Sequence, residues 1–210
     1  MNKLAILGAS GHGKVLADMA ELIGWKSVIF FDDVWPELTK NGHWSVAGNT
    51  AALLNKLSEF DGVLVGIGNN TIRLAKQEQL VAHGAELRSL VHPSAIVSRY
   101  AHIGVGSVVM AGAVINVDVH IGDACIINTN ASIDHDCVLA NGVHVSPAAA
   151  LAGGVKVSRA AWVGIGASVR QLIEIGAGAV VGAGAVVVKP VLPNTCVIGN
   201  PARVLNNVEC

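Results

Sequence analysis

The amino-acid sequence predicts an α/β domain over residues 1–90, followed by an all-β domain over residues 91–210. The second domain is predicted to be a parallel β-helix of stacked coils, with repeats over residues 91–192 and a C-terminal tail. Three observations predict this division. Aliphatic residues recur at every sixth position from Val91 to Val187, whereas the first 90 residues alternate short apolar runs with a helical pattern. Hydrophobic residues make up 52% of the chain but aromatic residues only 4%, so the core must be aliphatic. A fixed short period is typical of stacked repeats, and strand–helix alternation of a parallel sheet.

The repeat contains seventeen consecutive aliphatic positions without an insertion. A mostly small residue stands four places after each aliphatic residue, as at Ala113, Cys125 and Ala131. These features predict short strands whose aliphatic side chains point inward, joined by corners where small residues let the chain bend. Glycine often follows the aliphatic residue directly, where we expect it to serve a tight backbone turn. The positions concerned are Gly104, Gly122, Gly164, Gly176 and Gly182.

This pattern resembles that of the hexapeptide-repeat acyltransferases. The resemblance implies that three hexads close one coil of a triangular prism, so seventeen hexads predict between five and six coils. It also implies a left-handed helix, against the usual right-handed crossover rule. The handedness is expected from the resemblance and not from the spacing.

The first domain is predicted to be Rossmann-like, with strands at residues 4–7, 27–31 and 63–67 and a helix at 14–23. A glycine loop opens this helix, so its backbone amides and the helix dipole are suited to a diphosphate. An acidic pair after the second strand is suited to ribose or base hydrogen bonds. The glycine spacing is GxxGxG and differs from the dinucleotide fingerprint GxGxxG. A turn that only packs helix on strand is therefore the alternative, but the second domain favours a nucleotide-linked substrate.

Charge and composition exclude several functional classes. A net charge of −1 supplies no basic field for nucleic acid or an anionic membrane surface. The apolar run after Met1 is too short for a signal peptide, and no stretch reaches membrane-helix length. The four cysteines lack metal-ligand or CxxC spacing, and Cys125 and Cys137 fall at small-residue positions. We expect a cytoplasmic protein that binds no metal.

Five features together resemble the NeuD/PglD family of bacterial sugar acetyltransferases. They are the GASGHG loop, the FDD after the second strand, the GIGNN turn, the hexads and the IDHDC segment. The resemblance covers essentially the whole chain. It implies an acetyl-CoA-dependent N-acetyltransferase that acts on the 4-amino group of a UDP-4-amino-4,6-dideoxy-N-acetyl-hexosamine, as in UDP-N,N'-diacetylbacillosamine synthesis.

The resemblance also implies roles for particular residues. His135 matches the general base and Asp136 the acid that raises its basicity. His144, Gly153 and Ile165 match coenzyme-contacting positions. The nucleotide-sugar side matches the glycine loop, the acidic pair and the GIGNN turn, which hold Ser10, Gly11, His12, Gly13, Asp32, Asp33, Gly68 and Asn69. Family members often carry Glu where this chain has Asp134 and Asp136, so the residue that supports the base stays open between these two.

The chemistry of acetyl transfer fits these residue types. An amine nucleophile needs a base, histidine titrates in the required range, and a carboxylate fixes its tautomer. The oxyanion formed from a thioester needs a donor such as the Gly153 N–H. No cysteine stands beside a histidine as an acyl-enzyme would require, so direct attack in a ternary complex is expected.

Other interpretations compete with this one. His102 and His120, eighteen residues apart, are expected to form a surface ladder without a catalytic part. Trp162 is expected at a turn, in packing and not in coenzyme stacking. Asn128 and Asn130 either reach the sugar or form a ladder. The alternative reaction is O-acetylation of a sialic acid or another sugar. A zinc carbonic anhydrase is disfavoured by the histidine spacing, and a non-catalytic nucleotide-sugar-binding protein by the sequence Asp134-His135-Asp136.

The spacing of two histidines predicts an assembly. His135 and His144 are nine residues apart, which is half a coil of eighteen. Their side chains then lie on opposite sides of one prism, so a shared site requires neighbouring subunits. A low charged content of 14% also suits buried faces. The sequence therefore predicts a homotrimer with three sites between subunits.

Overall fold

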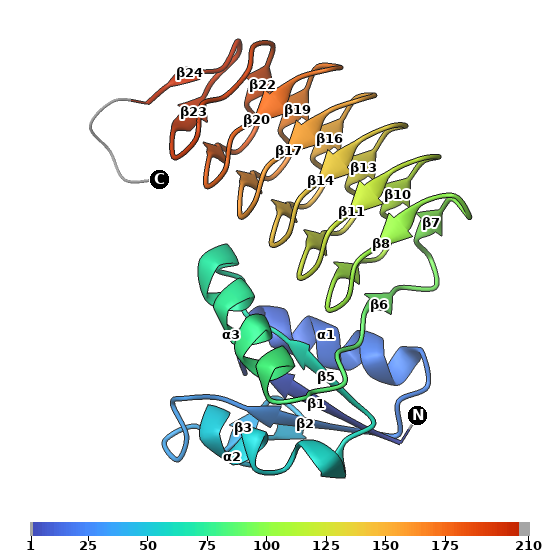
Figure 1. Cartoon of the computed structure of the whole chain (residues 1–210), viewed down its shortest axis with the longest axis vertical. Coiled ribbons are helices and arrows are strands. Elements are labelled where there is room, and N and C mark those ends of the chain that lie inside the picture. Colours follow the sequence, from blue (N-terminus) through green and yellow to red (C-terminus); the bar gives the residue numbers. More distant parts are fainter. Residues whose placement is uncertain (1, 206–210) are drawn as a thin grey trace. The chain divides into compact units, whose positions relative to one another are not determined.

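A computed structural model describes residues 2–205 of the chain. The last residues of the predicted C-terminal tail, 206–210, including Cys210, lie outside the described residues. The chain divides into two compact units, residues 1–90 and 91–210 (Figure 1).

The first unit is a three-stranded parallel sheet in the order β2-β1-β5, flanked by helices. Its strands are β1 (Lys3–Leu7), β2 (Ser27–Phe31) and β5 (Gly62–Val65), and its α-helices are α1 (Gly11–Leu22), α2 (Thr50–Leu54) and α3 (Asn70–Ala82). A two-stranded hairpin, β3 (Lys40–Asn41) and β4 (Trp44–Ser45), and a 3-10 turn, η1 (Leu57–Glu59), complete it. Every residue of β5 and all but the first of β1 are buried. These strands are apolar because a sheet covered on both faces buries its side chains on both sides.

The predicted α/β class is confirmed, with shifts at the element ends. Helix α1 begins at Gly11 and not at Lys14, so the end of the glycine loop forms the first helical turn. Strand β5 ends at Val65, two residues before the predicted Ile67. Val15 and Leu22 fit the helical pattern but are exposed, because α1 buries only the face that carries Leu16, Met19 and Ala20.

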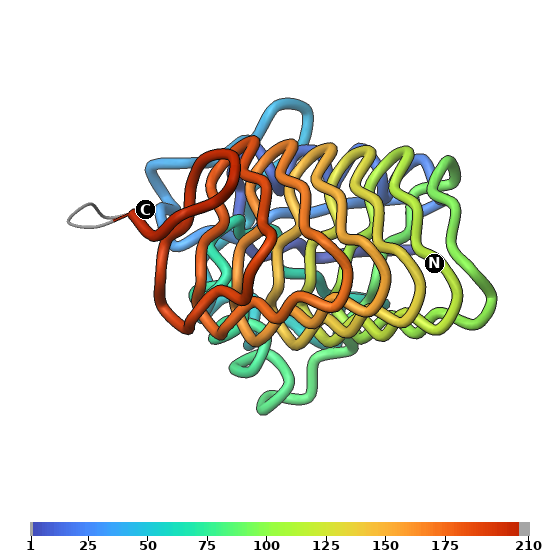
Figure 2. Tube along the Cα trace, turned by 90° about the horizontal axis from the view of Figure 1, so that it is seen from above, coloured from blue at the N-terminus to red at the C-terminus, as the bar shows by residue number. Residues whose placement is uncertain are grey.

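The second unit is a β-solenoid of two-residue strands that follow one another in regular coils (Figures 1 and 2). Strand β6 (Leu90–Val91) crosses the boundary between the units. The remaining strands are β7 (Ile96–Val97), β8 (His102–Ile103), β9 (Val108–Val109), β10 (Val114–Ile115), β11 (His120–Ile121), β12 (Ile126–Ile127), β13 (Ser132–Ile133), β14 (Val138–Leu139), β15 (His144–Val145), β16 (Ala150–Leu151), β17 (Lys156–Val157), β18 (Trp162–Val163), β19 (Ser168–Val169), β20 (Glu174–Ile175), β21 (Val180–Val181), β22 (Val186–Val187), β23 (Cys196–Ile198) and β24 (Arg203–Val204).

Each strand from β7 to β19 pairs in parallel with the strand eighteen residues later, as in the register Ile115, Ile133 and Leu151. Three hexads thus make one coil, and the coils form three sheets. Sheet C includes β12, β15, β18 and β21. Sheet D includes β10, β13, β16 and β19. Sheet E includes β8, β11, β14 and β17. Sheet D has six strands, so the solenoid has about six turns, and the predicted parallel β-helix is confirmed.

The interior of the prism holds the aliphatic side chains and the small residues together. Ile121, Cys125 and Ile127 are almost completely buried, and the same holds for the inward residues from Val109 to Val187, whereas those of the first hexads, such as Val97 and Ile103, are partly buried. Such burial contributes about 25 cal/mol for each Å² of apolar surface removed from water. Cys125 and Cys137 are buried thiols that form no disulfide, which fits their predicted place as small residues of the core.

The predicted role of the glycines after the aliphatic residues is wrong. Left-handed backbone, with φ between 54° and 74°, occurs at every sixth residue from Gly106 to Gly184, three places after the aliphatic residue. Gly104 and Gly164 are absent from that set. A Cβ on Gly104 would lie 2.5 Å from the Asp123 side chain, and a Cβ on Gly164 2.5 Å from the Val181 carbonyl oxygen. These glycines therefore allow close approach of the next coil and do not make the turn.

The eighteen-residue register ends near the last hexads. Val181 pairs with Val197, sixteen residues later, so the final coil is two residues shorter. Strand β24 then returns antiparallel to β23.

Candidate active site

All the residues predicted to bind the nucleotide sugar follow the carboxyl ends of the three parallel strands. Ser10 to Gly13 follow β1, Asp32 and Asp33 follow β2, and Gly68 and Asn69 follow β5. The structure thus brings them to one edge of the first unit's sheet, where open α/β sheets bind ligands.

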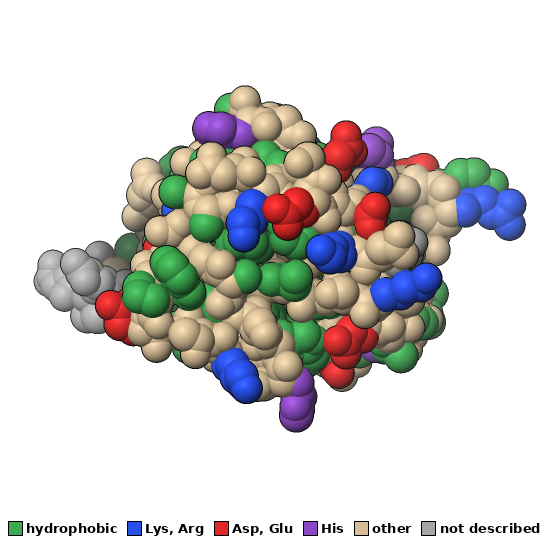
Figure 3. All heavy atoms as spheres, turned by 90° about the horizontal axis from the view of Figure 1, so that it is seen from below, with side chains coloured by type: hydrophobic (Ala, Val, Ile, Leu, Met, Phe, Trp, Pro, Cys, Tyr) green, Lys and Arg blue, Asp and Glu red, His purple; other side chains and the backbone are tan. Residues whose placement is uncertain are grey.

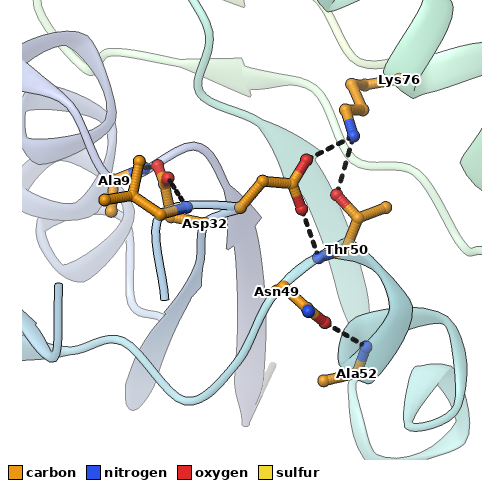
Figure 4. Close-up of polar contacts among 8 residues, drawn as sticks. Ala9, Asp32, Asn49, Thr50, Ala52 and Lys76 are labelled. Atoms are coloured by element: carbon orange, nitrogen blue, oxygen red, sulfur yellow. Dashed lines mark hydrogen bonds and ion pairs between the residues drawn. The ribbon is translucent and has the colours of Figure 1, made fainter. Parts of the chain in front are cut away.

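The two predicted acidic residues are already bonded to the protein (Figure 4). Asp32 Oδ2 accepts from the Ala9 N–H at 2.7 Å and so holds the glycine loop. Asp33 accepts from the Thr50 N–H at 2.8 Å and pairs with Lys76 Nζ at 2.7 Å. Although partial burial acts to raise it, the hydrogen bonds from Lys76 and Thr50 lower the pKa of Asp33 to about 2. Both carboxylates therefore shape this edge through protein contacts.

The glycine loop combines a packing role with an open one. A Cβ on Gly13 would collide with the Gly8 carbonyl oxygen, so Gly13 packs α1 against the sheet. Gly11 has no atom within 4 Å of such a Cβ, and the first amides of α1 have no partner inside the helix. This open turn is suited to a phosphate.

The Nε2 atom of His12 is buried, whereas Asn69 is exposed and caps a helix. Burial, assisted by the charge of Arg73, lowers the pKa of His12 to about 4, and no group of residues 2–205 bonds its buried Nε2. The Asn69 side chain accepts from the Ile72 N–H at 3.0 Å and caps α3. The Gly68 carbonyl accepts from the buried Arg73 guanidinium at 2.9 Å. The contacts of Asn69 and Arg73 thus hold the loop between β5 and α3 in place.

In the β-helix, His135 and Asp136 form an exposed pair at the corner between sheets D and E. Nδ1 of His135 lies 2.6 Å from Oδ2 of Asp136. Asp136 occupies the left-handed corner position, with φ 59°, which Asp tolerates better than most residues. The hydrogen bond that Nδ1 of His135 donates to Asp136, with the charge of Asp134, raises the pKa of His135. A carboxylate on Nδ1 leaves Nε2 as the ring's free basic atom.

Asp134 contacts the backbone and not the imidazole. Its Oδ1 accepts from the His135 N–H and from the Asn116 side chain, each at 2.8 Å, and these bonds lower the pKa of Asp134. Asp136 is therefore the acid that touches the ring, and Asp134 is fixed from the preceding coil by Asn116.

Gly153 lies one coil beyond His135, directly against its ring. A Cβ on Gly153 would lie 2.5 Å from both Cε1 and Nε2 of His135. Among residues 2–205, no acceptor contacts the Gly153 N–H. Gly153 therefore leaves space for the imidazole of His135 and places a backbone donor beside it.

His144 is in sheet C and is 8% exposed. Its Nε2 lies 3.1 Å from the Asn128 amide nitrogen, and its ring stacks on Trp162. His144, Trp162 and Ile165 line one cavity of about 430 Å³. Trp162 belongs to strand β18, so its predicted place in a turn is wrong: the eighteen-residue register puts it beside His144.

The structure does not bring His135 and His144 together within one chain. The first lies at the corner between sheets D and E, and the second on sheet C, the remaining side of the prism. The cavity beside His144 contains no part of His135. The half-coil separation that the sequence predicts is therefore present.

Residues 2–205 hold no group of three or more His, Cys, Asp or Glu side chains that could bind a metal ion. Within the same residues, no helix is long and apolar enough to cross a membrane. One face of the molecule shows acidic and basic side chains interspersed (Figure 3). His102 and His120 are exposed on paired strands, with ring centroids 6.2 Å apart, and they lie apart from both site histidines.

Comparisons with known proteins match both units. Residues 3–80 match the model of the PglD N-terminal domain. The acetyltransferase domain of PglB from Neisseria gonorrhoeae, solved with acetyl coenzyme A, is 43% identical with a TM-score of 0.92, over 97% of this chain and 98% of that one. A mutant of perosamine N-acetyltransferase from Caulobacter crescentus, solved with CoA and GDP-perosamine, is 38% identical with a TM-score of 0.93, over 98% of this chain and 97% of that one.

A curated relative was also found. UDP-N-acetylbacillosamine N-acetyltransferase of Bacillus subtilis is 39% identical over 116 residues, which are 53% of this chain and 52% of that protein. The chain thus spans about half the length of this curated relative.

Proposed function

The chain belongs to the NeuD/PglD family of hexapeptide-repeat sugar acetyltransferases, and on that premise we propose that it transfers the acetyl group of acetyl-CoA to the amino group of a nucleotide-linked amino sugar. The observation that carries the proposal is the pair formed by His135 and Asp136 at an exposed corner of the β-helix, with Nδ1 of His135 2.6 Å from Oδ2 of Asp136. The acetyl-CoA and nucleotide-sugar complexes of the relatives support the two substrates.

In this proposal His135 is the general base. The amine nitrogen attacks the thioester carbonyl carbon, a C–N bond forms, the C–S bond breaks and coenzyme A leaves as a thiolate. The proton lost by the amine passes to Nε2 of His135 and then to the thiolate or to solvent. Asp136 holds the proton on Nδ1 and stabilises the imidazolium, which matches the raised pKa of His135. The Gly153 N–H is the donor to the developing oxyanion.

The remaining predicted residues divide between the two substrates. The open first turn of α1, at Gly11, Gly13 and the Ser10 cap, receives the diphosphate of the nucleotide sugar. Asp32, Asp33 and Asn69 hold the loops around it. His144 and Ile165 line the cavity in which the coenzyme's thioester end is placed.

The active form in this proposal is a homotrimer. His135 and His144 lie on different sides of one prism, so a site that uses both takes His135 from one subunit and His144 from its neighbour. The outward side chains of sheet D are suited to such packing because they are uncharged and mostly small, including Ser132, Ala150 and Ser168.

The preferred acceptor is the 4-amino group of a UDP-4-amino-4,6-dideoxy-N-acetyl-hexosamine, as the bacillosamine relative suggests. The GDP-perosamine complex of another relative makes a GDP-linked amino sugar the second candidate. Sugar O-acetylation is the alternative reaction on the same scaffold.

The test is to incubate the protein with acetyl-CoA and a panel of UDP-amino sugars, GDP-perosamine and sialic acids, and to follow free thiol release. We expect turnover with a UDP-linked 4-amino sugar and an amide in the product by mass spectrometry. Turnover of hydroxyl acceptors alone would overturn N-acetylation, and turnover of the GDP sugar alone would overturn the choice of nucleotide. His120→Ala is the matched control, because it removes an exposed histidine of the same helix that lies outside the proposed site.

A further inference from the structure

The ring of His144 is held between two neighbours from other coils. On one side Asn128 Nδ2 lies 3.1 Å from its Nε2. On the other side the indole of Trp162 stacks on it, with ring centroids 5.3 Å apart and planes at 13°. With the Asn128 amide as donor, Nε2 is an acceptor and the neutral ring carries its proton on Nδ1. The stack fixes the plane of the ring, and Asn128 fixes its tautomer.

The indole itself is anchored. Trp162 Nε1 donates to the hydroxyl of Ser146 at 2.7 Å, and Ser146 is buried. This bond fixes the second torsion of the tryptophan side chain, so its ring cannot turn away from His144. Ser146 follows the strand that carries His144, so the same two coils hold both rings.

One face of the indole is nevertheless open. Trp162 remains 42% exposed and borders the cavity of about 430 Å³, whose other walls include Pro147, Ile165 and Ala183. It is the only Trp, Tyr or Phe in residues 101–210. A lone, anchored and half-exposed aromatic ring at an apolar cavity is suited to bind a flexible chain of methylene and amide groups.

We propose that Trp162 is a positioning residue that sets the orientation of His144 and forms the wall on which the pantetheine arm of the coenzyme packs. This inference rests on the proposed function. It assigns to Trp162 a contact with the acyl-carrying arm, whereas the sequence predicts packing alone. Ser146 acts through Trp162.

The test uses Trp162→Ala, Trp162→Phe and Ser146→Ala. Phenylalanine retains a stacking face but loses the bond to Ser146. We expect Trp162→Ala to raise KM for acetyl-CoA about tenfold and to lower kcat about tenfold, while KM for the sugar stays unchanged. Trp162→Phe and Ser146→Ala should lower kcat only a few-fold. Equal loss of affinity for both substrates, with a lowered melting temperature, would indicate a purely structural role and overturn the proposal.

A spectroscopic measurement is independent of turnover. The other three tryptophans lie in residues 1–90, so Trp162 is the single indole of the β-helix. Titration with CoA should change the tryptophan emission of the wild type saturably, and the change should be absent in Trp162→Phe. Trp35→Phe is the matched control, because Trp35 is 40% exposed in the other unit. Its CoA response should equal that of the wild type.

Binding of CoA to the wild type and to Trp162→Ala distinguishes a failure of the proposed function from a failure of the role of Trp162. If calorimetry shows no CoA binding to the wild type, the proposed function fails. If CoA binds the wild type and Trp162→Ala equally, without a change in Trp162 emission, the proposed function stands and the role of Trp162 is wrong.

Discussion

His135 and His144 are nine residues apart on one β-helix, yet their surroundings are opposite. His135 is exposed at a corner and touches the carboxylate of Asp136, whereas His144 is buried in a sheet between Asn128 and Trp162. A base that exchanges protons needs a free ring nitrogen and a stabilised charged form. A group that orients a substrate needs a fixed ring. In the proposed function these surroundings suit His135 to proton transfer and His144 to positioning.

The largest effect is expected from removal of the base. His135→Ala should lower kcat at least ~100-fold, as for loss of a general base, and should leave assembly unchanged because the side chain is exposed. Steady-state kinetics with size-exclusion chromatography checks both statements. Turnover close to that of the wild type would remove His135 from the mechanism.

Mixed subunits test whether the two histidines act in one site across an interface. His135→Ala and His144→Ala subunits, each nearly inactive alone, are unfolded together and refolded at equal amounts. A cleft works only when one neighbour supplies His135 and the other His144, so random assembly restores about one quarter of wild-type clefts. Activity as low as that of the parents would refute shared sites.

The acid beside the base should control the pH profile. The hydrogen bond from His135 to the Asp136 carboxylate raises the pKa of His135, so Asp136→Asn should lower that pKa and move the acidic limb of kcat to lower pH. The remaining rate should fall by about tenfold, because an amide no longer holds the proton on Nδ1. Asp134→Asn is the comparison variant: Asp134 acts on the ring only through charge, so its shift should be smaller. Equal shifts in both variants would contradict this division.

A smaller effect is expected in the first unit. Asp33→Ala removes the bonds to Thr50 and Lys76, and Asp32→Ala frees the Ala9 amide. Each should raise KM for the sugar by roughly 5–10-fold with kcat little changed, as for lost uniform binding. Calorimetry should show unchanged affinity for acetyl-CoA. Weakened coenzyme binding would instead reverse the assignment of substrates to the two units.

Much of the β-helix is predictable because its period is short and its core is uniform. The aliphatic positions place every strand from β7 to β22. Residues eighteen apart become neighbours on adjacent coils, so the spacing alone predicts the contact of His144 with Trp162 and that of Asn116 with Asp134. Asn128 and Ser146 are different, since their partners are sixteen residues away and only the folded corners bring them close.

The backbone conformation of the corners and the contacts of the first unit are harder to predict from the sequence. Left-handed backbone occurs at Ala124, Ala148 and Leu172, residue types that rarely adopt it, so coil stacking and not local preference imposes it. Lys76 meets Asp33 because helix α3 passes this edge of the sheet, and no local pattern around Lys76 indicates that contact. The family resemblance named the acid pair, but only the geometry separates Asp136 from Asp134.

The antiparallel return of β24 has a consequence for solubility. A stack of parallel coils ends in a row of unpaired backbone groups, which is a template for another chain and for filament growth. Here the final coil is shortened, and β24 covers β23 with only two residue pairs, Val197 with Val204 and Ile198 with Arg203. Within residues 2–205 the outermost strand is therefore brief and carries an exposed cationic side chain. End-to-end addition of a second prism at this edge would find few hydrogen-bond partners and would bury a charge.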